Sequence, residues 1–217
     1  MKKLVIFDLD GTLLNTIADL GNAANYALTT AGYATHPLAE YPYFVGNGVR
    51  KLIERVLPGG TASPEKVDEL LKYFKDYYGT HLHDLTQPYE GISTLLEEIT
   101  AAGVKVAVAS NKYQRAVDVL IRHFFPNILW AAVEGQKEGI PVKPDPSIVF
   151  SILSAAPTPK ADVLYVGDSN VDMETARRAC VESCGVTWGF RPEQELVDAH
   201  ADHIAHNTEQ LRALILG

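Results

Sequence analysis

The chain has little of what marks secreted, membrane-spanning or nucleic-acid-binding proteins. Two cysteines in 217 residues cannot form a disulfide-stabilised scaffold, and they suit a reducing compartment. The 19 basic residues face 27 acidic ones, which gives a formal net charge of −8. A nucleic-acid or anionic-membrane surface would need a basic excess. Because no apolar run approaches the length of a membrane span, we expect a cytoplasmic protein with no nucleic-acid and no membrane partner.

Strand-like and helix-like patterns alternate along most of the chain. The expected strands cover residues 4–7, 104–110, 128–133, 163–167 and 185–188. The expected helices cover residues 92–102, 114–123, 147–155 and 172–180, with a last one from residue 208. Regular alternation of this kind is typical of α/β proteins with a doubly wound parallel sheet. We therefore predict a Rossmann-like core.

One long segment interrupts this alternation. Between residues 16 and 87 helical patterns cover 17–31, 49–57 and 65–81, and no good strand is present. The segment is too long for a loop, and a chain of 217 residues can hold one core and a smaller second unit. We predict an all-helical subdomain over residues 16–87, inserted into a core of residues 1–15 and 88–217. Two short crossings between them would suit a hinge.

Polar residues gather where the expected strands end. Asp8 and Asp10 follow the first strand, and alternation would put both on one face, where two carboxylates need a metal ion, a shared proton or a cation. The other residues of this kind are Ser110 and Asn111 after the second strand, Lys143 before a helix, and Asp168 and Asp172 after the fourth strand. Carboxyl ends of parallel strands meet at one edge of a sheet, so we expect these side chains to lie close together.

These residue types suit the transfer of a phosphoryl group. Asp8 is a candidate nucleophile or metal ligand, and Asp168 is a second oxygen ligand of the kind that Mg²⁺ prefers. Ser110 offers a hydroxyl at a helix N-terminus and Lys143 offers a cation, and both suit a phosphate. In-line phosphoryl transfer depends mainly on such positioning and charge stabilisation. The sequence therefore predicts a Mg²⁺ site that accepts a small phosphorylated metabolite.

The order and loose spacing of these motifs resemble the haloacid dehalogenase superfamily. Residues Asp8–Thr12 resemble its first motif, and Ser110 resembles its second. Lys143 resembles the third motif, and Gly167–Asp172 resembles the fourth. The helical segment of residues 16–87 resembles the family's cap between the first two motifs. The resemblance covers nearly the whole chain, and it implies a Mg²⁺-dependent phosphomonoesterase with a mobile helical cap.

The resemblance also implies a role for each catalytic residue. Asp8 would attack phosphorus and form an aspartyl-phosphate. Asp10 would protonate the leaving oxygen and then take a proton from the water that hydrolyses this intermediate. Ser110 and Lys143 would hold the phosphoryl oxygens.

The same resemblance implies a Mg²⁺ ion with four associated aspartates. Asp8, the backbone carbonyl of Asp10 and the carboxylate of Asp168 would bind the ion directly. Asp172 would lie outside this set and orient either a metal-bound water or a neighbouring lysine.

Two further segments resemble those of phosphoglycolate phosphatases, residues 45–50 in the expected cap and residues 185–190 in the core. Gly46 and Gly48 would let the backbone approach a ligand. Arg50 would pair with a carboxylate of the substrate. A turn that starts a helix, with a solvated arginine, is the alternative interpretation of the same residues.

Thr12 and Asn111 are the remaining predicted substrate contacts, and two other functions stay open. A hexose-phosphate mutase of the same superfamily would share every core motif, although Thr12 favours a phosphatase, because related mutases often carry valine there. A non-catalytic phosphate-binding regulator would need no acid and nucleophile together, as Asp10 and Asp8 provide. Asp10 also argues against a dehalogenase, since a halide leaves without an acid. We expect a monomer or a homodimer.

Overall fold

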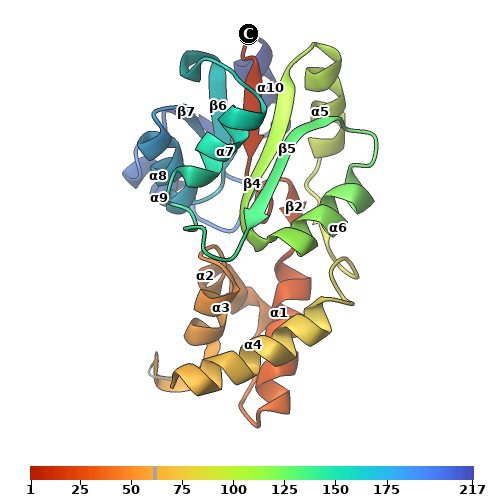
Figure 1. Ribbon diagram of the computed structural model, residues 1–217, viewed down its shortest axis with the longest axis vertical. Coiled ribbons are helices and arrows are strands. Elements are labelled where there is room, and N and C mark those ends of the chain that lie inside the picture. Colours follow the sequence, from red (N-terminus) through yellow and green to blue (C-terminus); the bar gives the residue numbers. More distant parts are fainter. Residues whose placement is uncertain (61–62) are drawn as a thin grey trace. The chain divides into compact units, whose positions relative to one another are not determined.

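Four consecutive apolar residues, Leu4–Phe7, form strand β1 inside the main sheet of this computed structural model (Figure 1). All four side chains are buried, which is typical of a parallel strand covered on both faces. β1 pairs in parallel with β4 (Lys105–Tyr113) on one side and with β6 (Val163–Gly167) on the other. The six strands lie in the order β5-β4-β1-β6-β7-β8, and each of these pairings is parallel.

The structure describes residues 1–60 and 63–217. Their contacts divide the chain into two units, one of residues 1–15 with 88–217 and the other of residues 16–87. Two short strands, β2 (Leu14–Asn15) and β3 (Gln87–Pro88), pair with each other where the chain passes from one unit to the other. Within the described residues, no helix has both the length and the apolar character needed to cross a membrane.

The first unit combines the sheet with helices on both of its faces (Figure 1). Its remaining strands are β5 (Trp130–Gln136), β7 (Glu182–Val186) and β8 (His203–Ala205). Its helices are α5 (Ile92–Ala101), α6 (Gln114–Phe124), α7 (Ser147–Ala155), α8 (Asn170–Ala179), α9 (Glu193–Asp198) and α10 (Thr208–Leu216). Helices α5, α6 and α10 lie on one face, and α7, α8 and α9 on the other. The predicted α/β fold with a doubly wound parallel sheet is confirmed.

One core cluster lies on the face covered by α7 and α8. Buried side chains of three strands meet those of both helices there. The cluster includes Ile6, Ala107, Val149, Tyr165 and Ala176. Close packing of this kind fixes the strands against one another, and it therefore also fixes the loops at their carboxyl ends.

Two outer strands differ from expectation, and a third was not expected. β5 runs from Trp130 to Gln136 instead of 128–133, and β7 covers Glu182–Val186 instead of 185–188. β8, at the edge of the sheet, lies in a polar stretch that contains His203 and pairs with β7. The side chains of these polar residues have partners, since Glu182 forms ion pairs with Lys2 and His203. The local residue pattern does not reveal such ion pairs, because they join distant parts of the sequence.

The second unit is helical. Its helices are α1 (Ile17–Thr30), α2 (Tyr41–Phe44), α3 (Val49–Val56) and α4 (Pro64–Tyr78). Short 3-10 turns of the chain occupy Leu38–Glu40, Pro58–Gly60 and, in the first unit, Lys160–Asp162. The hydroxyl of Ser63 accepts a hydrogen bond from the backbone N–H of Lys66 and so caps α4. The buried side chains of Phe74 and Tyr78 on α4 contribute to the core of this unit.

Candidate active site

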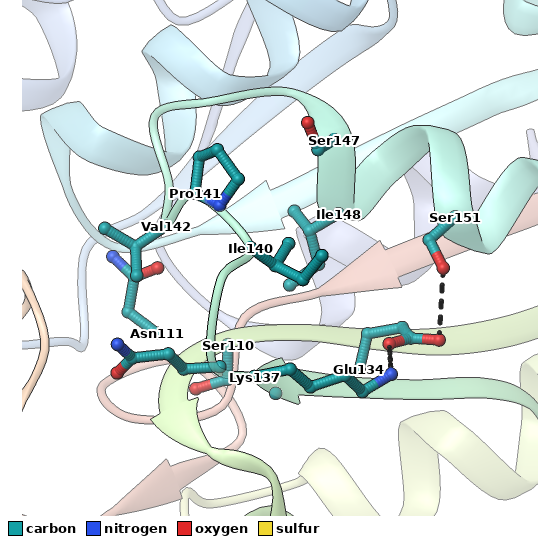
Figure 2. A pocket seen from close by; sticks show the side chains of 12 residues that line it. Ser110, Asn111, Glu134, Lys137, Ile140, Pro141, Val142, Ser147, Ile148 and Ser151 are labelled. Carbon is teal, nitrogen blue, oxygen red and sulfur yellow. Dashed lines mark hydrogen bonds and ion pairs between the residues drawn. The ribbon is translucent and has the colours of Figure 1, made fainter.

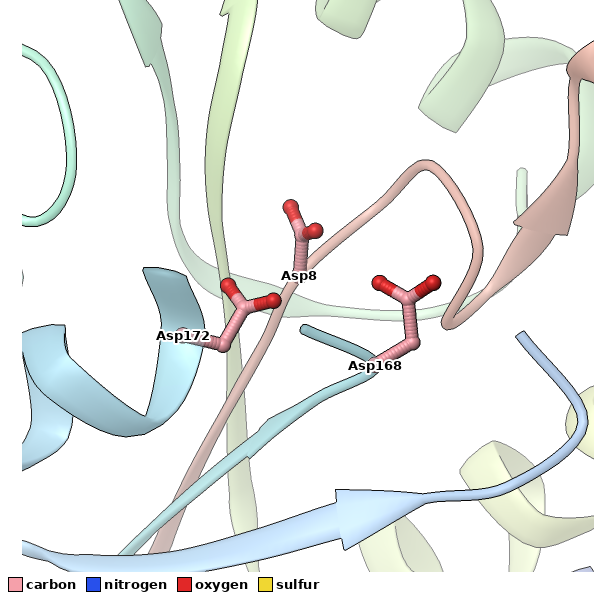
Figure 3. A group of neighbouring side chains, drawn as sticks. All are labelled: Asp8, Asp168 and Asp172. Atoms are coloured by element: carbon pink, nitrogen blue, oxygen red, sulfur yellow. The ribbon is translucent and has the colours of Figure 1, made fainter. Parts of the chain in front are cut away.

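Two aspartates directly follow neighbouring strands of the sheet. β1 ends at Phe7 and β6 ends at Gly167, so Asp8 and Asp168 are the next residues of each segment. Asp172 lies in the first turn of α8. Figure 3 shows the three aspartate side chains as neighbours, and one oxygen of each lies within 4.8 Å of the others. The packing of β1 beside β6 thus brings together carboxylates that lie 160 residues apart in the sequence.

Lys143 joins two of these carboxylates. Its Nζ lies 2.8 Å from Asp8 Oδ1 and 2.8 Å from Asp172 Oδ1, and it donates to the carbonyl oxygen of Ala109. The lysine side chain is 2% exposed. Burial opposes its charge, but Asp172 and Asp8 outweigh burial and hold the pKa of Lys143 well above its ordinary value. A positive charge therefore lies beside Asp8 at any physiological pH.

The carboxylates of this site carry more negative charge than the protein compensates. Burial raises the pKa of Asp8 to about 7, although Lys143 opposes the shift. Burial, with Asp172 and Asp8 adding to it, also holds the pKa of Asp168 well above its ordinary value. Buried carboxylate oxygens that lack sufficient positive charge fit a divalent cation with a preference for oxygen ligands, such as Mg²⁺.

Asp172 differs from the other two aspartates because hydrogen bonds engage both of its oxygens. Oδ1 accepts from Lys143, and Oδ2 accepts from the hydroxyl of Ser169 at 2.6 Å and from its backbone N–H at 3.2 Å. Asp168 instead accepts one hydrogen bond at Oδ2 from the backbone N–H of Phe190, at 2.7 Å. Asp168 therefore fits direct contact with a cation better than Asp172 does.

Ser110 and Asn111 lie on the last part of β4, and both are buried. The hydroxyl of Ser110 accepts a hydrogen bond from the backbone N–H of Lys112, at 3.2 Å. The Asn111 side chain accepts from the backbone N–H of Lys143 at 2.8 Å and donates to the carbonyl oxygen of the same residue at 3.1 Å. Asn111 thus holds the backbone of Lys143, a contact that the prediction of substrate binding did not include.

Sequence reasoning missed Lys112. Its Nζ lies 2.8 and 3.1 Å from the two carboxylate oxygens of Asp10, and the side chains of this pair are only 4% and 14% exposed. The available signal was a lysine two residues after Ser110, at the end of an apolar strand. A lysine in such a place needs a buried anionic partner.

Thr12 lies in the turn after Asp10 and is fully buried. Its carbonyl oxygen accepts a hydrogen bond from Trp188 Nε1, at 3.1 Å. Its hydroxyl has no hydrogen-bond partner among the described residues. A buried hydroxyl of this kind is costly unless another group satisfies it, so it is a candidate contact for a ligand.

The predicted substrate contacts of the helical unit lie at the start of α3. Gly46 has φ 115° and Gly48 has φ 82°, a backbone region that favours glycine. Arg50 forms an exposed ion pair with Asp68 of α4. Arg55, which the sequence did not single out, donates to the carbonyl oxygen of Phe44 at 2.9 Å and to Asn47 Oδ1 at 2.6 Å, and so holds this loop.

A small cavity of about 210 Å³ lies beside Ser110 and Asn111 (Figure 2). Its walls include Ile140, Ile148 and Glu134. The carboxylate of Glu134 forms an ion pair with Lys137 and accepts a hydrogen bond from the hydroxyl of Ser151. Among the described residues that line it there is none of the three clustered aspartates. The carboxylate cluster is therefore the candidate site for phosphoryl chemistry, and this cavity is not.

Comparison with known proteins shows the family of this chain. The model of the haloacid dehalogenase-like hydrolase family matches residues 5–186. This chain belongs to that family. The phosphoglycolate phosphatase of Vibrio cholerae is 33% identical to it over 224 residues, which cover 99% of this chain and 97% of the relative. The phosphoglycolate phosphatase of Psychrobacter arcticus is 31% identical over 201 residues, which cover 90% and 87%.

A solved structure also matches the whole chain. A Lactobacillus delbrueckii protein predicted to be a phosphoglycolate phosphatase has a TM-score of 0.91 and 34% identity, and the match covers 100% of both chains. The predicted family is confirmed, and these relatives identify the chain as a haloacid dehalogenase-like phosphatase.

Proposed function

We propose that the chain is a Mg²⁺-dependent phosphomonoesterase that works through an aspartyl-phosphate on Asp8. The observation that carries this proposal is the buried group of Asp8, Lys143 and Asp168, in which a nucleophilic carboxylate lies 2.8 Å from a permanent cation and beside a second carboxylate. A phosphoryl group needs these same elements around it in an in-line transfer.

In the first half-reaction an oxygen of Asp8 attacks phosphorus, and the bond from phosphorus to the leaving oxygen breaks. Asp10 gives a proton to that oxygen, so a neutral alcohol leaves. The hydroxyl of Ser110 and the ammonium of Lys143 hold the phosphoryl oxygens. Because Lys143 also contacts Asp8, it keeps the anionic substrate next to the anionic nucleophile.

In the second half-reaction Asp10 takes a proton from water, whose oxygen attacks the phosphorus of the intermediate. Inorganic phosphate leaves, and the carboxylate of Asp8 is restored. The Nζ of Lys112 lies 2.8 Å from Oδ1 of Asp10.

Asp8, the backbone carbonyl of Asp10 and Asp168 would hold Mg²⁺, and Asp172 would orient Lys143 or a metal-bound water. When bound, the ion would offset the negative charge that Asp8 and the phosphoryl group bring together. This donor set contains only oxygen, as Mg²⁺ sites in proteins do.

We propose phosphoglycolate as the substrate. The names of the relatives from Vibrio cholerae and Psychrobacter arcticus support this choice. In this proposal residues 16–87 act as a cap, in which Arg50 exchanges Asp68 for the carboxylate of the substrate and Gly46 and Gly48 bring the backbone to it. Thr12 would offer its hydroxyl, which has no hydrogen-bond partner in the part of the chain that the structure describes, and Asn111 would act through the backbone of Lys143.

The first test is the variant Asp8→Asn. It removes the nucleophile, so phosphate release from phosphoglycolate and from p-nitrophenyl phosphate should fall by at least about 10³-fold. Asp198→Asn, at an exposed site in the same unit, is the matched control and should keep wild-type activity. Retained activity in Asp8→Asn, with an unchanged circular dichroism spectrum, would remove Asp8 from the nucleophile role.

A panel of substrates tests the rest of the proposal. Phosphate release should be fastest from phosphoglycolate among small phosphoesters, sugar phosphates, nucleotides and pyrophosphate, and EDTA should abolish it. Conversion of a hexose 1-phosphate into the 6-phosphate without free phosphate would indicate a mutase instead. Binding of phosphate with no turnover of any substrate would indicate a regulator.

A further inference from the structure

The loop after β7 approaches Asp168 closely. In the sheet Gly185 of β7 lies opposite Gly167 of β6, so the chain leaves β7 at the edge where Asp168 lies. The backbone N–H of Phe190 then donates to Asp168 Oδ2, at 2.7 Å. This bond fixes the plane of a buried carboxylate that would otherwise rotate about its side-chain bonds.

Gly189 makes this approach possible. A Cβ at this position would lie 2.5 Å from the carbonyl oxygen of Gly11, and closer still to the side chain of Asp168. Real side chains do not tolerate such distances, so any residue other than glycine would push the loop away from Asp168. The absence of a side chain at position 189 therefore decides whether the amide of Phe190 reaches the carboxylate.

Trp188 ties the same loop to the first motif. Its indole Nε1 donates to the carbonyl oxygen of Thr12, at 3.1 Å. Thr12 follows Asp10 and Gly11 in one tight turn, in which the backbone N–H of Gly11 donates to the carbonyl oxygen of Leu14. Trp188 thus contacts the turn after Asp10, Phe190 contacts Asp168, and Gly189 between them leaves room for this close approach.

We propose that the loop Trp188–Phe190 sets the affinity of this site for its divalent cation by holding the carboxylate of Asp168 in one orientation. The inference rests on the proposed function, because it takes the group of Asp8 and Asp168 as the binding site of that cation. Trp188, Gly189 and Phe190 are positioning residues here, since they act on the cation only through Asp168 and the turn at Thr12. Groups that orient a metal ligand typically change metal affinity by about 10- to 100-fold when they are lost.

The test measures cation binding directly, with Mn²⁺ as the probe ion because it also prefers oxygen ligands. The electron paramagnetic resonance signal of free Mn²⁺ reports the bound fraction without any turnover. Gly189→Ala should weaken Mn²⁺ binding by about tenfold or more. Trp188→Phe keeps an aromatic ring but removes the indole N–H, and it should weaken binding by a smaller factor, about fivefold.

Gly103→Ala is the matched control. Gly103 precedes β4 at the opposite end of the sheet, has φ 86°, and has open space around the position of a Cβ. The substitution strains the backbone and lowers the melting temperature, but it should leave Mn²⁺ affinity unchanged. A loss of affinity in Gly189→Ala together with an unchanged Gly103→Ala separates positioning from general destabilisation.

The possible outcomes distinguish this inference from the proposed function. Asp168→Asn should abolish Mn²⁺ binding. Wild-type affinity in folded Gly189→Ala would overturn the inference while the proposed function stands. Should Gly189→Ala not fold, wild-type affinity in Trp188→Phe would overturn it. A wild-type chain that binds no Mn²⁺ would overturn both.

Discussion

Lys112 carries a positive charge into a position where its side chain is 4% exposed. Both oxygens of Asp10 contact its Nζ. Removal of one member of a buried ion pair leaves the other charge without compensation, which costs more than the pair itself contributes. Lys112→Met should therefore lower the free energy of unfolding by about 3 kcal/mol, measured by urea denaturation.

The control for this variant is Lys105→Met, which changes an exposed residue of the same strand and should alter stability by less than about 0.5 kcal/mol. The double variant Lys112→Met with Asp10→Asn removes both charges and should regain part of the lost stability. Equal stability of Lys112→Met and the wild type would show that the pair is not buried in solution.

Residue patterns predicted the position of Asp8 and Asp168 because each follows an apolar run that is typical of a buried strand. Parallel strands then bring both to one edge of the sheet. The same pattern indicated Asn111, but it indicated neither the contact that Asn111 makes nor Lys112. Lys112 contacts Asp10 and Asn111 contacts the backbone of Lys143, partners that the sequence places 102 and 32 residues away. The catalytic roles of all these residues stay predictions.

At the scale of elements, Asp19 on α1 makes a contact between two segments that are distant in the sequence. Its buried carboxylate accepts hydrogen bonds from the backbone N–H groups of Leu85 and Thr86 and from the hydroxyl of Thr86, at 2.7 to 3.1 Å. These residues end the helical unit just before the chain enters β3. One carboxylate thus joins the first helix of the unit to its last segment.

Asp19→Asn should weaken this junction, because an amide offers one acceptor oxygen where the carboxylate offers two. We expect the free energy of unfolding of the helical unit to fall by about 2 kcal/mol. The amide hydrogens of Leu85 and Thr86 should also exchange faster with solvent. Asp68→Asn, whose side chain is 61% exposed, is the control and should leave both measurements unchanged. Unchanged exchange at both amides in Asp19→Asn would contradict the assignment.

Elements with a clear apolar period were predicted well, and those held by polar contacts were not. The start of α3 at Val49 and both ends of α7 agree with expectation, because apolar spacing and a proline start define these helices. β8 was missed because its three residues lie in a histidine-rich stretch with no apolar run. β4 continues to Tyr113 because buried partners satisfy polar side chains that by themselves indicate a loop.

Charge links the site to the stability of the whole molecule. The chain carries a net charge of −8, and Asp8 and Asp168 lie in a buried group where burial raises the pKa of both carboxyls. A divalent cation bound there would neutralise charge on these carboxylates. Binding to the folded chain alone would stabilise it by an amount that grows with the concentration of the cation.

This coupling gives a pH dependence with a definite sign. Burial raises the pKa of Asp8 from 3.8 to about 7, so between these pH values the folded chain holds a proton that the unfolded chain has released. Without metal, the stability that Asp8 contributes is present at low pH and is lost as pH rises through about 7. Carboxylates whose pKa is lowered on folding, such as Glu182, lose their contribution to stability only when the pH falls below the ordinary pKa of 4.5. They therefore do not oppose this trend above pH 5.

We therefore expect the melting temperature in EDTA to fall between pH 5 and pH 8, and Mg²⁺ to restore it mainly at pH 8, where no proton competes for Asp8. Differential scanning calorimetry at both pH values, with and without Mg²⁺, measures this. Asp8→Asn lacks this titrating group, so its melting temperature in EDTA should change less with pH, and comparison with it removes the effect of Asp168, whose pKa burial also raises. If Mg²⁺ stabilises the wild type equally at pH 5 and pH 8, protons and the cation do not compete, and the ion binds somewhere other than Asp8.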